Sequence, residues 1–282
     1  MKTFVDKVVV ITGAGSGMGR AYALEFAKLG AKLALNDYAP EGLFETAELA
    51  RKAGAKDVYA EAFDVSSQAA IEDFASQVQS SLGNAHIVIN NAGVAGAMVP
   101  FWDIPQESWE RTMNINFWGV VFGTRAFLPQ LKANGEGAVV NVSSIFGLIG
   151  PPIHAEYCAS KFAVRGFTEC LMAELADSPI SVHLVHPGGI ATNITRGSQV
   201  EDQAKASAFN KQYLTTAPEA IARRVIRGIR RREPKIVYGQ DSFRVWLASN
   251  FVPTRWLTKL LWREFRQKGL IDKLRFGIKE SG

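Results

Sequence analysis

Short apolar runs alternate along this chain with longer stretches of helical periodicity, and this alternation restricts the fold more than any other feature. Most of the runs are apolar on both faces, which is typical of strands in a parallel sheet covered by helices on both sides. The predicted strands are Lys7–Thr12, Lys32–Asn36, Val58–Phe63, Ile87–Asn90, Ala138–Val142, Val182–Val185 and Lys235–Tyr238. The predicted helices are Met18–Leu29, Pro40–Ala53, Gln68–Leu82, Ser108–Leu131, Ala155–Leu175 and Pro218–Arg232. The pattern indicates an α/β fold with a doubly wound, seven-stranded parallel sheet.

The chain of 282 residues shows no internal repeat, low-complexity segment or linker, so we expect one α/β domain over residues 1–240. Its composition, 47% hydrophobic and 21% charged, is ordinary for a globular protein with a full core. The longest stretch without an expected strand or helix is Thr192–Ala217. It is either a lid over a site or an ordinary surface loop with a short helix.

Basic residues gather in the last quarter of the chain. Residues 1–218 hold 16 Lys and Arg against 21 Asp and Glu, a net charge of −5. Residues 219–282 hold 16 Lys and Arg against 6 Asp and Glu, a net charge of +10. A basic segment of this kind is compatible with a nucleic acid, a lipid surface or a solvated face. We interpret residues 241–282 as a basic amphipathic extension and expect no nucleic-acid partner.

The extension is expected to form helices over Val245–Phe265, broken near Pro253. Apolar residues recur there at helical spacing with cations between them, namely Trp256, Leu257, Leu260, Leu261 and Phe265 with Lys259, Arg263 and Arg266. Such a helix can lie on an anionic lipid surface as a peripheral contact. The favoured alternative is a helix that docks on its own subunit or a neighbour, or that covers an apolar substrate site.

The two cysteines, Cys158 and Cys170, fall in one predicted helix, where a rise of about 1.5 Å per residue separates them by roughly 18 Å. A disulfide needs Cα atoms within about 7 Å, so the two cannot pair. Free thiols and the lack of a secretory leader indicate a reducing compartment, and we expect a cytoplasmic protein. No window approaches about 18 uninterrupted apolar residues, so no membrane-spanning helix is expected.

A glycine-rich turn of the form Thr-Gly-x-x-x-Gly-x-Gly, residues 12–19, follows the first predicted strand and leads into a helix. Glycines let the backbone approach a pyrophosphate, and the helix N-terminus offers free N–H groups. Asp37 lies 20 residues after Gly17, where an acidic residue accepts hydrogen bonds from an adenosine ribose. Turn and acid together favour a dinucleotide site over a simple turn cap. Asp64, after the third strand, either caps the next helix or contacts adenine.

Tyr157 and Lys161 are four residues apart in a predicted helix, so their side chains share one face. A free tyrosine has a pKa near 10, and lowering it by about 3 units requires about 4 kcal/mol. One ammonium at about 4–5 Å supplies roughly 3–4 kcal/mol at an effective dielectric near 20. The pair can therefore act as an acid–base group, although a Tyr-x-x-x-Lys pair in isolation is more often a surface pair.

Ser143 and Ser144 follow the strand Ala138–Val142, at the edge where open α/β sheets bind ligands. A hydroxyl there can hold a substrate oxygen while charge develops on it, although two serines after a strand are more often a turn. The Gly-x-Ser-x-Gly elbow of a hydrolase is lacking, and the histidines show no triad-like order. They also lack metal-ligand spacing, so no metal is expected.

Taken together, these residues resemble the short-chain dehydrogenase/reductase family over roughly residues 5–240. The matching pieces are Thr12-Gly13-x-x-x-Gly17-x-Gly19, Asn90-Asn91-Ala92-Gly93, Asn116 with Gly119, Ser144, Tyr157-x-x-x-Lys161, and Pro187-Gly188 with Thr192. Ser144 precedes Tyr157 by 13 residues, the family's usual spacing, which selects it over Ser143. The ordered set is specific, although each piece alone is weak.

The resemblance implies that Tyr157 donates or accepts the proton and that Ser144 positions the substrate oxygen. Lys161 is implied to lower the pKa of Tyr157 and to hold the nicotinamide ribose. Asn116 is implied to kink its helix and to support a water that links Lys161 to solvent. The family further implies a Rossmann sheet of order 3-2-1-4-5-6-7 and a homodimer or homotetramer.

Contacts with the cofactor are implied for Gly13, Ser16, Gly17, Met18, Gly19, Asp37, Asp64, Val65, Asn91, Gly93, Tyr157, Lys161, Pro187, Gly188, Ile190 and Thr192. Asn91 is placed by the adenosine ribose, Asp64 at adenine, and Ile190 with Thr192 at the carboxamide. Asp37 predicts NAD rather than NADP, because the extra phosphate of NADP would meet its carboxylate. Arg20, the one basic residue nearby, is expected to face away from the ribose.

The expected reaction is the interconversion of an alcohol and a ketone or aldehyde. Residues around the reactive end are mostly apolar, namely Ile145, Phe146, Leu148, Ile149, Ile153 and Ile194, which favours a hydrophobic secondary alcohol. Arg196 is the nearest candidate for binding a carboxylate. The alternatives are an epimerase or dehydratase that oxidises a sugar nucleotide transiently, and a non-enzymatic binding protein on the same fold.

Overall fold

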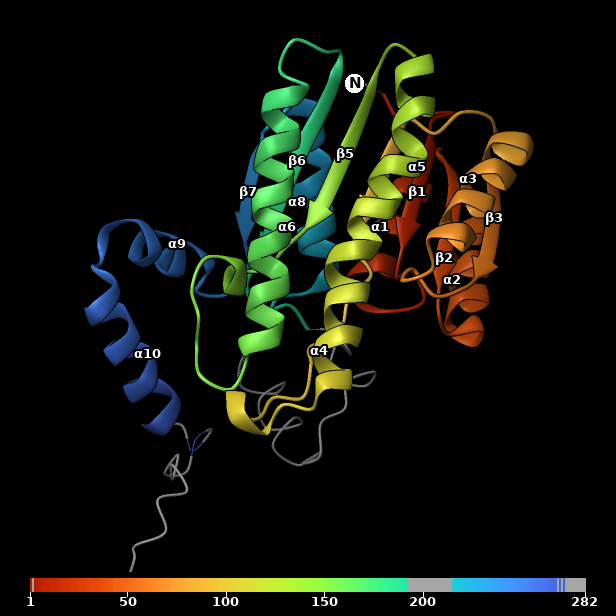
Figure 1. Cartoon of the computed structure of the whole chain (residues 1–282). Coiled ribbons are helices and arrows are strands. Elements are labelled where there is room, and N and C mark those ends of the chain that lie inside the picture. The colour runs from red at the N-terminus through yellow and green to blue at the C-terminus, as the bar shows by residue number, and fades with distance from the viewer. Residues whose placement is uncertain (2, 192–214, 268, 270, 272–282) are drawn as a thin grey trace, which may run out of the picture.

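The computed structural model describes the whole chain except residues 2, 192–214, 268, 270 and 272–282 (Figure 1). Its described part forms one seven-stranded parallel sheet in the order β3-β2-β1-β4-β5-β6-β7. The strands are β1 (Val8–Thr12), β2 (Lys32–Asp37), β3 (Asp57–Ala62), β4 (Ile87–Asn90), β5 (Gly137–Val142), β6 (Ile180–Pro187) and β7 (Lys235–Tyr238). The predicted fold class and strand order are confirmed. The largest boundary error lies in β6, which extends two residues further at each end than predicted.

Helices cover both faces of the sheet, as the double apolarity of the strands requires (Figure 1). They are α1 (Gly17–Ala27), α2 (Pro40–Lys52), α3 (Gln68–Leu82), α4 (Gln106–Met113), α5 (Gly119–Ala133), α6 (Ala155–Glu174), α8 (Pro218–Arg231), α9 (Ser242–Phe251) and α10 (Thr254–Gln267). Alternate residues of β1 point to opposite faces. Val9 and Ile11 pack with α1, α2 and α8, whereas Val8 and Val10 pack with α3, α5 and α6.

The single helix predicted over Ser108–Leu131 is wrong in one respect. A π-helical turn, Asn114–Trp118, separates α4 from α5. The amide of Asn116 is buried inside this turn and bonds the backbone of Val94, outside its own helix. A residue inserted into the helical ladder for such a contact produces a π-bulge, which is frequent at functional sites.

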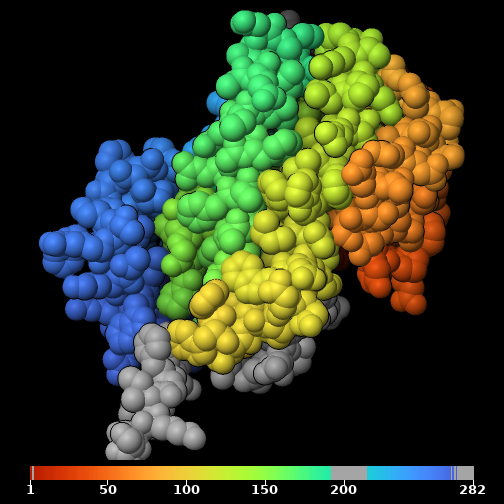
Figure 2. Space-filling view, viewed as in Figure 1, coloured from red at the N-terminus to blue at the C-terminus, as the bar shows by residue number. Residues whose placement is uncertain are grey.

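Beyond β7 the chain continues into α9 and α10, with Val252 and Pro253 between them. The predicted pair of helices broken near Pro253 is therefore confirmed. Both helices stand beside the main body, at the left of Figures 1 and 2. Among the described residues, no helix is both long and apolar enough to cross a bilayer.

Candidate active site

Two cavities share Met18, Asn91 and Gly93 in their walls, so they adjoin each other, and we call them together the cleft at the carboxyl ends of the strands. The first, which we call the glycine-turn cavity, has a volume of about 520 Å³ and lies beside Gly13, Ser16, Gly17, Met18, Asp37, Asp64, Val65, Asn91 and Gly93. The second, the tyrosine cavity, has a volume of about 200 Å³ and lies beside Ser144, Tyr157, Lys161, Pro187, Gly188 and Ile190. The strand order reverses between β1 and β4, where open α/β sheets bind nucleotides.

All the predicted site residues that the structure describes line one of these cavities, with two exceptions. Gly19 lies beneath the turn, where an added Cβ would overlap the carbonyl oxygen of Gly13. Asn116 is buried behind the cleft. The predicted contact Thr192, the apolar Ile194 and the candidate cation Arg196 lie outside the described residues, as does most of the Thr192–Ala217 segment.

The glycine turn connects β1 to α1 in a conformation that side chains would hinder. Gly13 has φ +64°, and a Cβ there would also meet the backbone of Ala92 at 2.8 Å. Ser16 is the N-cap of α1, but its hydroxyl makes no capping bond, so the first N–H groups of the helix face the glycine-turn cavity with no side chain closing them. Such a helix start binds phosphate groups.

Asp37 ends β2 in the wall of the glycine-turn cavity. One carboxylate oxygen accepts a hydrogen bond from Gly15 N at 2.8 Å, and the other accepts one from Ala39 N at 2.9 Å. A carboxylate accepts about four hydrogen bonds, so capacity for a ligand is left. Asp37 can therefore cap the turn and still bind a ribose. Arg20 is turned to Gly15 O, Thr46 and Glu45 and does not line the cavity.

Asn91 joins the ends of β1 and β4. Its amide nitrogen donates to the carbonyl oxygens of Thr12 and Gly13 at 2.9 and 3.2 Å. Its Oδ1 is buried and has no hydrogen-bond partner in the described protein, although Asn91 lines both cavities. An orphaned acceptor of this kind requires a donor from a ligand or a water. On the other wall, Asp64 accepts a bond from Ser66 N while Ser67 caps α3, so the capping reading of Asp64 is wrong.

Tyr157 and Lys161 lie one turn apart on α6, with Lys161 Nζ 5.7 Å from the centre of the Tyr157 ring. Both side chains are buried, and Nζ donates to Val142 O at 3.1 Å. Burial raises the pKa of Tyr157 to about 12, against the effect of its hydrogen bond with Ser144. Burial also lowers the pKa of Lys161 to about 8. In the protein alone, burial therefore dominates the pKa of Tyr157, and the implied role of Lys161 in lowering this pKa stays a prediction.

Asn116 holds the loop after β4 against α6. Its Oδ1 accepts from Val94 N at 2.8 Å, and its Nδ2 donates to Val94 O at 2.9 Å and to Ser160 Oγ at 3.0 Å. A Cβ on Gly93 would meet Asn116 Oδ1 at 3.0 Å and Lys161 Nζ at 3.4 Å. This glycine therefore allows the loop to approach both side chains. The implied water beside Asn116 stays a prediction.

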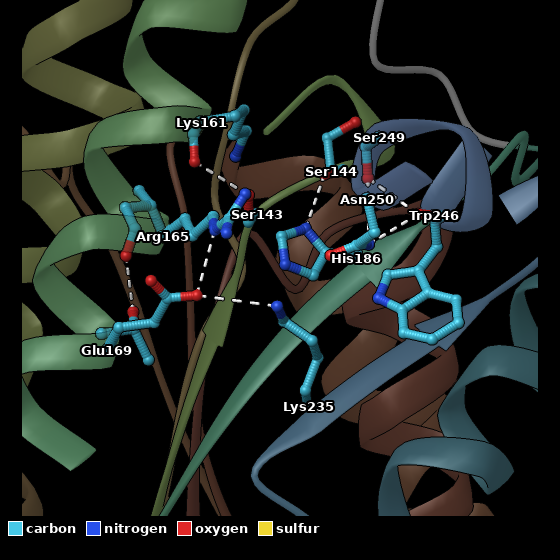
Figure 3. A network of polar contacts seen from close by, with 12 residues as sticks. Ser143, Ser144, Lys161, Arg165, Glu169, His186, Lys235, Trp246, Ser249 and Asn250 are labelled. Atoms are coloured by element: carbon cyan, nitrogen blue, oxygen red, sulfur yellow. Dashed lines mark hydrogen bonds and ion pairs between the residues drawn. The ribbon is translucent and has the colours of Figure 1, made fainter. Parts of the chain in front are cut away.

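The serine pair is held by His186, which the sequence did not single out as a site residue, and by the backbone of α6 (Figure 3). His186, at the end of β6, donates its Nδ1–H to Ser144 O at 2.7 Å. Ser143 also lines the tyrosine cavity, but its Oγ donates to Lys161 O at 2.9 Å and so braces α6. The Ser144 hydroxyl is the one beside Tyr157, as the spacing argument predicted.

The walls of the tyrosine cavity are largely apolar and come from distant parts of the chain. Ile145, Phe146 and Ile149 line it as expected, whereas Leu148 and Ile153 do not. The sequence missed the contributions of Met98, His154 and Glu264, whereas Val245, Leu261 and Phe265 belong to the segment that it offered as one possible cover for an apolar site. The regular spacing of Leu257, Leu261 and Phe265 was the available signal, but it did not specify the surface that this helical face covers. Elsewhere, the described residues hold no cluster of three or more metal-ligating side chains.

A doubly wound sheet with a glycine turn at one end of its cleft and a buried Tyr–Lys pair with a serine at the other defines a class, the dinucleotide-dependent oxidoreductases. Residues 7–203 match the family model described as short chain dehydrogenase, and the chain belongs to that family. Among similar proteins, the oxidoreductase SadH of Mycobacterium tuberculosis is 43% identical over 252 residues, covering 86% of this chain and 89% of SadH.

Two further comparisons extend this result. Epidermal retinol dehydrogenase 2 of Homo sapiens is 41% identical over 199 residues, covering 70% of this chain and 64% of that protein. A short-chain dehydrogenase/reductase from Burkholderia phymatum, solved in complex with NAD, has a TM-score of 0.77 and 31% identity, covering 84% of this chain and 90% of that one.

Proposed function

We propose that this oxidoreductase uses NAD(H) to interconvert a hydrophobic secondary alcohol and its ketone, with Tyr157 as the acid–base residue. The observation that carries the proposal is the convergence of Tyr157, Lys161 and Ser144 at an apolar cavity that adjoins the glycine-turn cavity. An epimerase or a non-enzymatic binding protein has no comparable support, since the complete catalytic set adjoins a small apolar cavity.

The residues present fit NAD. The helix start at Ser16 would hold the pyrophosphate, and Asp37 keeps acceptor capacity for a ribose. The buried, unpartnered Oδ1 of Asn91 lies between the two cavities, where a ligand that fills both can donate to it. The NAD complex of the relative from Burkholderia phymatum supports the same cofactor. Ile190 would contact the nicotinamide from the tyrosine cavity.

When bound, NAD would supply the two-electron oxidant or reductant and, in its oxidised form, a second positive charge beside the phenol. During alcohol oxidation, Tyr157 Oη accepts the hydroxyl proton; during ketone reduction, it donates that proton. Ser144 Oγ holds the substrate oxygen at the same point. Lys161, bonded to Val142 O, holds a positive charge beside the Tyr157 ring and opposes the effect of burial on the phenol.

The cavity walls support an apolar substrate. Ile145, Phe146, Ile149, Leu261 and Phe265 enclose the space in front of Tyr157. Two relatives are named for bulky apolar alcohols. They are epidermal retinol dehydrogenase 2 and estradiol 17-beta-dehydrogenase 11 of Macaca fascicularis. The latter is 34% identical over 260 residues, covering 92% of this chain and 83% of that protein. We also propose residues 1–240 as the catalytic domain and residues 241–282 as its extension.

A panel of secondary alcohols of increasing chain length, read by NADH absorbance, tests this function. We expect turnover with NAD⁺, and kcat/KM that rises by up to about fourfold for each methylene until the cavity is filled. Hydroxy acids of matched length are the control, and we expect lower kcat/KM for them. Turnover of none of the alcohols and ketones, or a preference for the acids, would contradict the proposal.

A further inference from the structure

The outward face of α9 exposes large apolar side chains to solvent. Phe243, Leu247 and Phe251 recur every four residues and so form one stripe along the helix. Phe251 is 76% exposed and Phe243 is 64% exposed. Single exposed apolar residues are ordinary, but a contiguous group indicates an interaction site.

The outward face of α10 combines cations with tryptophans. Arg255, Lys259, Arg263 and Arg266 are all exposed and follow helical spacing, so they share one side of the helix. Trp262 borders this cationic row on one side, and Trp256, 54% exposed, borders it on the other. Guanidinium groups lie over both rings, at 5.0 Å for Arg255 on Trp256 and 5.1 Å for Arg266 on Trp262. We call the α9 stripe and this α10 side together the basic–aromatic face.

The inner sides of the same two helices already have a partner within the chain. Val245 of α9 and Leu261 and Phe265 of α10 line the tyrosine cavity, and the Phe265 ring lies 5.9 Å from the His154 ring. The expectation that this segment covers an apolar site is thus supported for its inner side. It leaves the basic–aromatic face unexplained, because the side chains of that face are exposed and the two helices stand beside the main body (Figure 2).

We propose that the basic–aromatic face docks on an anionic phospholipid surface. Arginine and lysine side chains reach phosphate headgroups while their apolar stems stay at the interface, and tryptophan and phenylalanine enter the headgroup boundary. An isologous contact between two copies of this face would oppose cations to cations, which disfavours a second chain as the occupant. The net charge of +10 over residues 219–282 favours an anionic surface.

Docking would also place the α10 wall of the tyrosine cavity next to the lipid, so that an apolar alcohol could enter directly from the membrane. This consequence, unlike the docking itself, rests on the proposed function. Vesicle binding needs no turnover, so a failure of the docking proposal and a failure of the proposed function are distinguishable.

Sedimentation of the full chain with vesicles tests the docking. We expect binding to vesicles of phosphatidylserine and phosphatidylcholine in a ratio of about 1 to 2, much weaker binding to pure phosphatidylcholine, and loss with added salt. The combined change Arg255→Gln, Lys259→Gln, Arg263→Gln and Arg266→Gln should lower the partition coefficient by up to about three orders of magnitude. Trp256→Ser with Phe251→Ser should weaken binding without changing its salt dependence.

The matched control removes four exposed cations elsewhere, through Lys52→Gln, Lys56→Gln, Arg125→Gln and Lys132→Gln. It has the same net charge as the first variant and should bind nearly as the parent does. Equal loss in both variants would show attraction by net charge only and would overturn the proposal. So would a parent that stays in the supernatant at low salt, or an oligomer that dissociates in the first variant and thereby identifies a second copy as the occupant.

Discussion

The two ends of the cleft are built by different means. The glycine-turn cavity is large, and the backbone shapes it: the Gly13 carbonyl lies against Gly19, and a backbone N–H group donates to each oxygen of Asp37. The tyrosine cavity is smaller and is made by buried side chains, and its Tyr157 and Lys161 have pKa values that burial displaces in opposite directions.

This difference indicates how each end can fail. At the glycine-turn cavity, where the shape of the backbone holds the ligand, a substitution should lower the affinity, because the backbone has to move before the ligand fits. Where buried ionisable groups do the chemistry, a substitution changes the rate, because burial has already separated their pKa values from those in water. Changes at the two ends should therefore affect different kinetic constants.

The largest effect is expected for Tyr157→Phe. The change removes the oxygen that exchanges the proton, while the ring can keep its packing against Phe146. We expect kcat to fall by about 10²- to 10⁴-fold with little change in NAD affinity, measured by turnover and by calorimetry. A variant that keeps more than about a tenth of the rate would exclude Tyr157 as the acid–base residue.

Gly19→Ala, at the glycine-turn cavity, should instead weaken cofactor binding and leave kcat nearly unchanged. The new methyl group would overlap the Gly13 carbonyl oxygen and distort the turn, which we expect to weaken NAD binding by roughly a hundredfold. At saturating cofactor, kcat should recover most of its parent value. Gly166→Ala is the control, because an added Cβ in the exposed middle of α6 meets nothing within 4 Å. If Gly19→Ala lowers only kcat, the prediction that the two ends of the cleft affect different kinetic constants is wrong.

The sequence predicted the strands well, because each strand is a short apolar run between a glycine or polar turn and a helix. It also predicted the cleft, since Asp37, Ser144 and Pro187 follow parallel strands whose carboxyl ends must meet. It could not place Phe265 against His154, 111 positions apart, because the apolar face of a helix does not specify what it covers. It also did not give the pKa direction of Tyr157, which depends on burial by these distant segments.

We also expect three buried histidines to dominate the loss of folding stability at low pH. Burial lowers the pKa of His154, His183 and His186 to about 4, below the value near 6.5 in an unfolded chain. Between these values the unfolded state binds more protons, so stability is lost as the pH falls from about 6.5 through 4, by on the order of 3 kcal/mol for each group. Urea unfolding across this range should show a shallower decline for His186→Asn than for the parent. The same slope in both would contradict the buried neutral state of His186.

The smallest effect, on the cofactor ratio, is expected at Asp37. The extra phosphate of NADP would lie about 4–5 Å from this carboxylate, which costs up to about 4 kcal/mol at an effective dielectric of 20. Solvent and side-chain movement should reduce this to about 1–3 kcal/mol, or roughly 10- to 100-fold in favour of NAD. Arg20 offers little relief, since its guanidinium is held by Gly15 O and Glu45.

Asp37→Ala removes the charge together with the acceptors for Gly15 N and Ala39 N, so it cannot separate charge from turn geometry. Asp37→Asn removes the charge and one of the two acceptors, so it keeps one of the two backbone hydrogen bonds of the turn. If the charge selects the cofactor, kcat/KM for NAD over NADP should fall in both variants, mainly through better use of NADP in the Asn variant. If Asp37 only holds the turn, both cofactors should lose equally in the Ala variant, and the ratio should stay at the parent value in both.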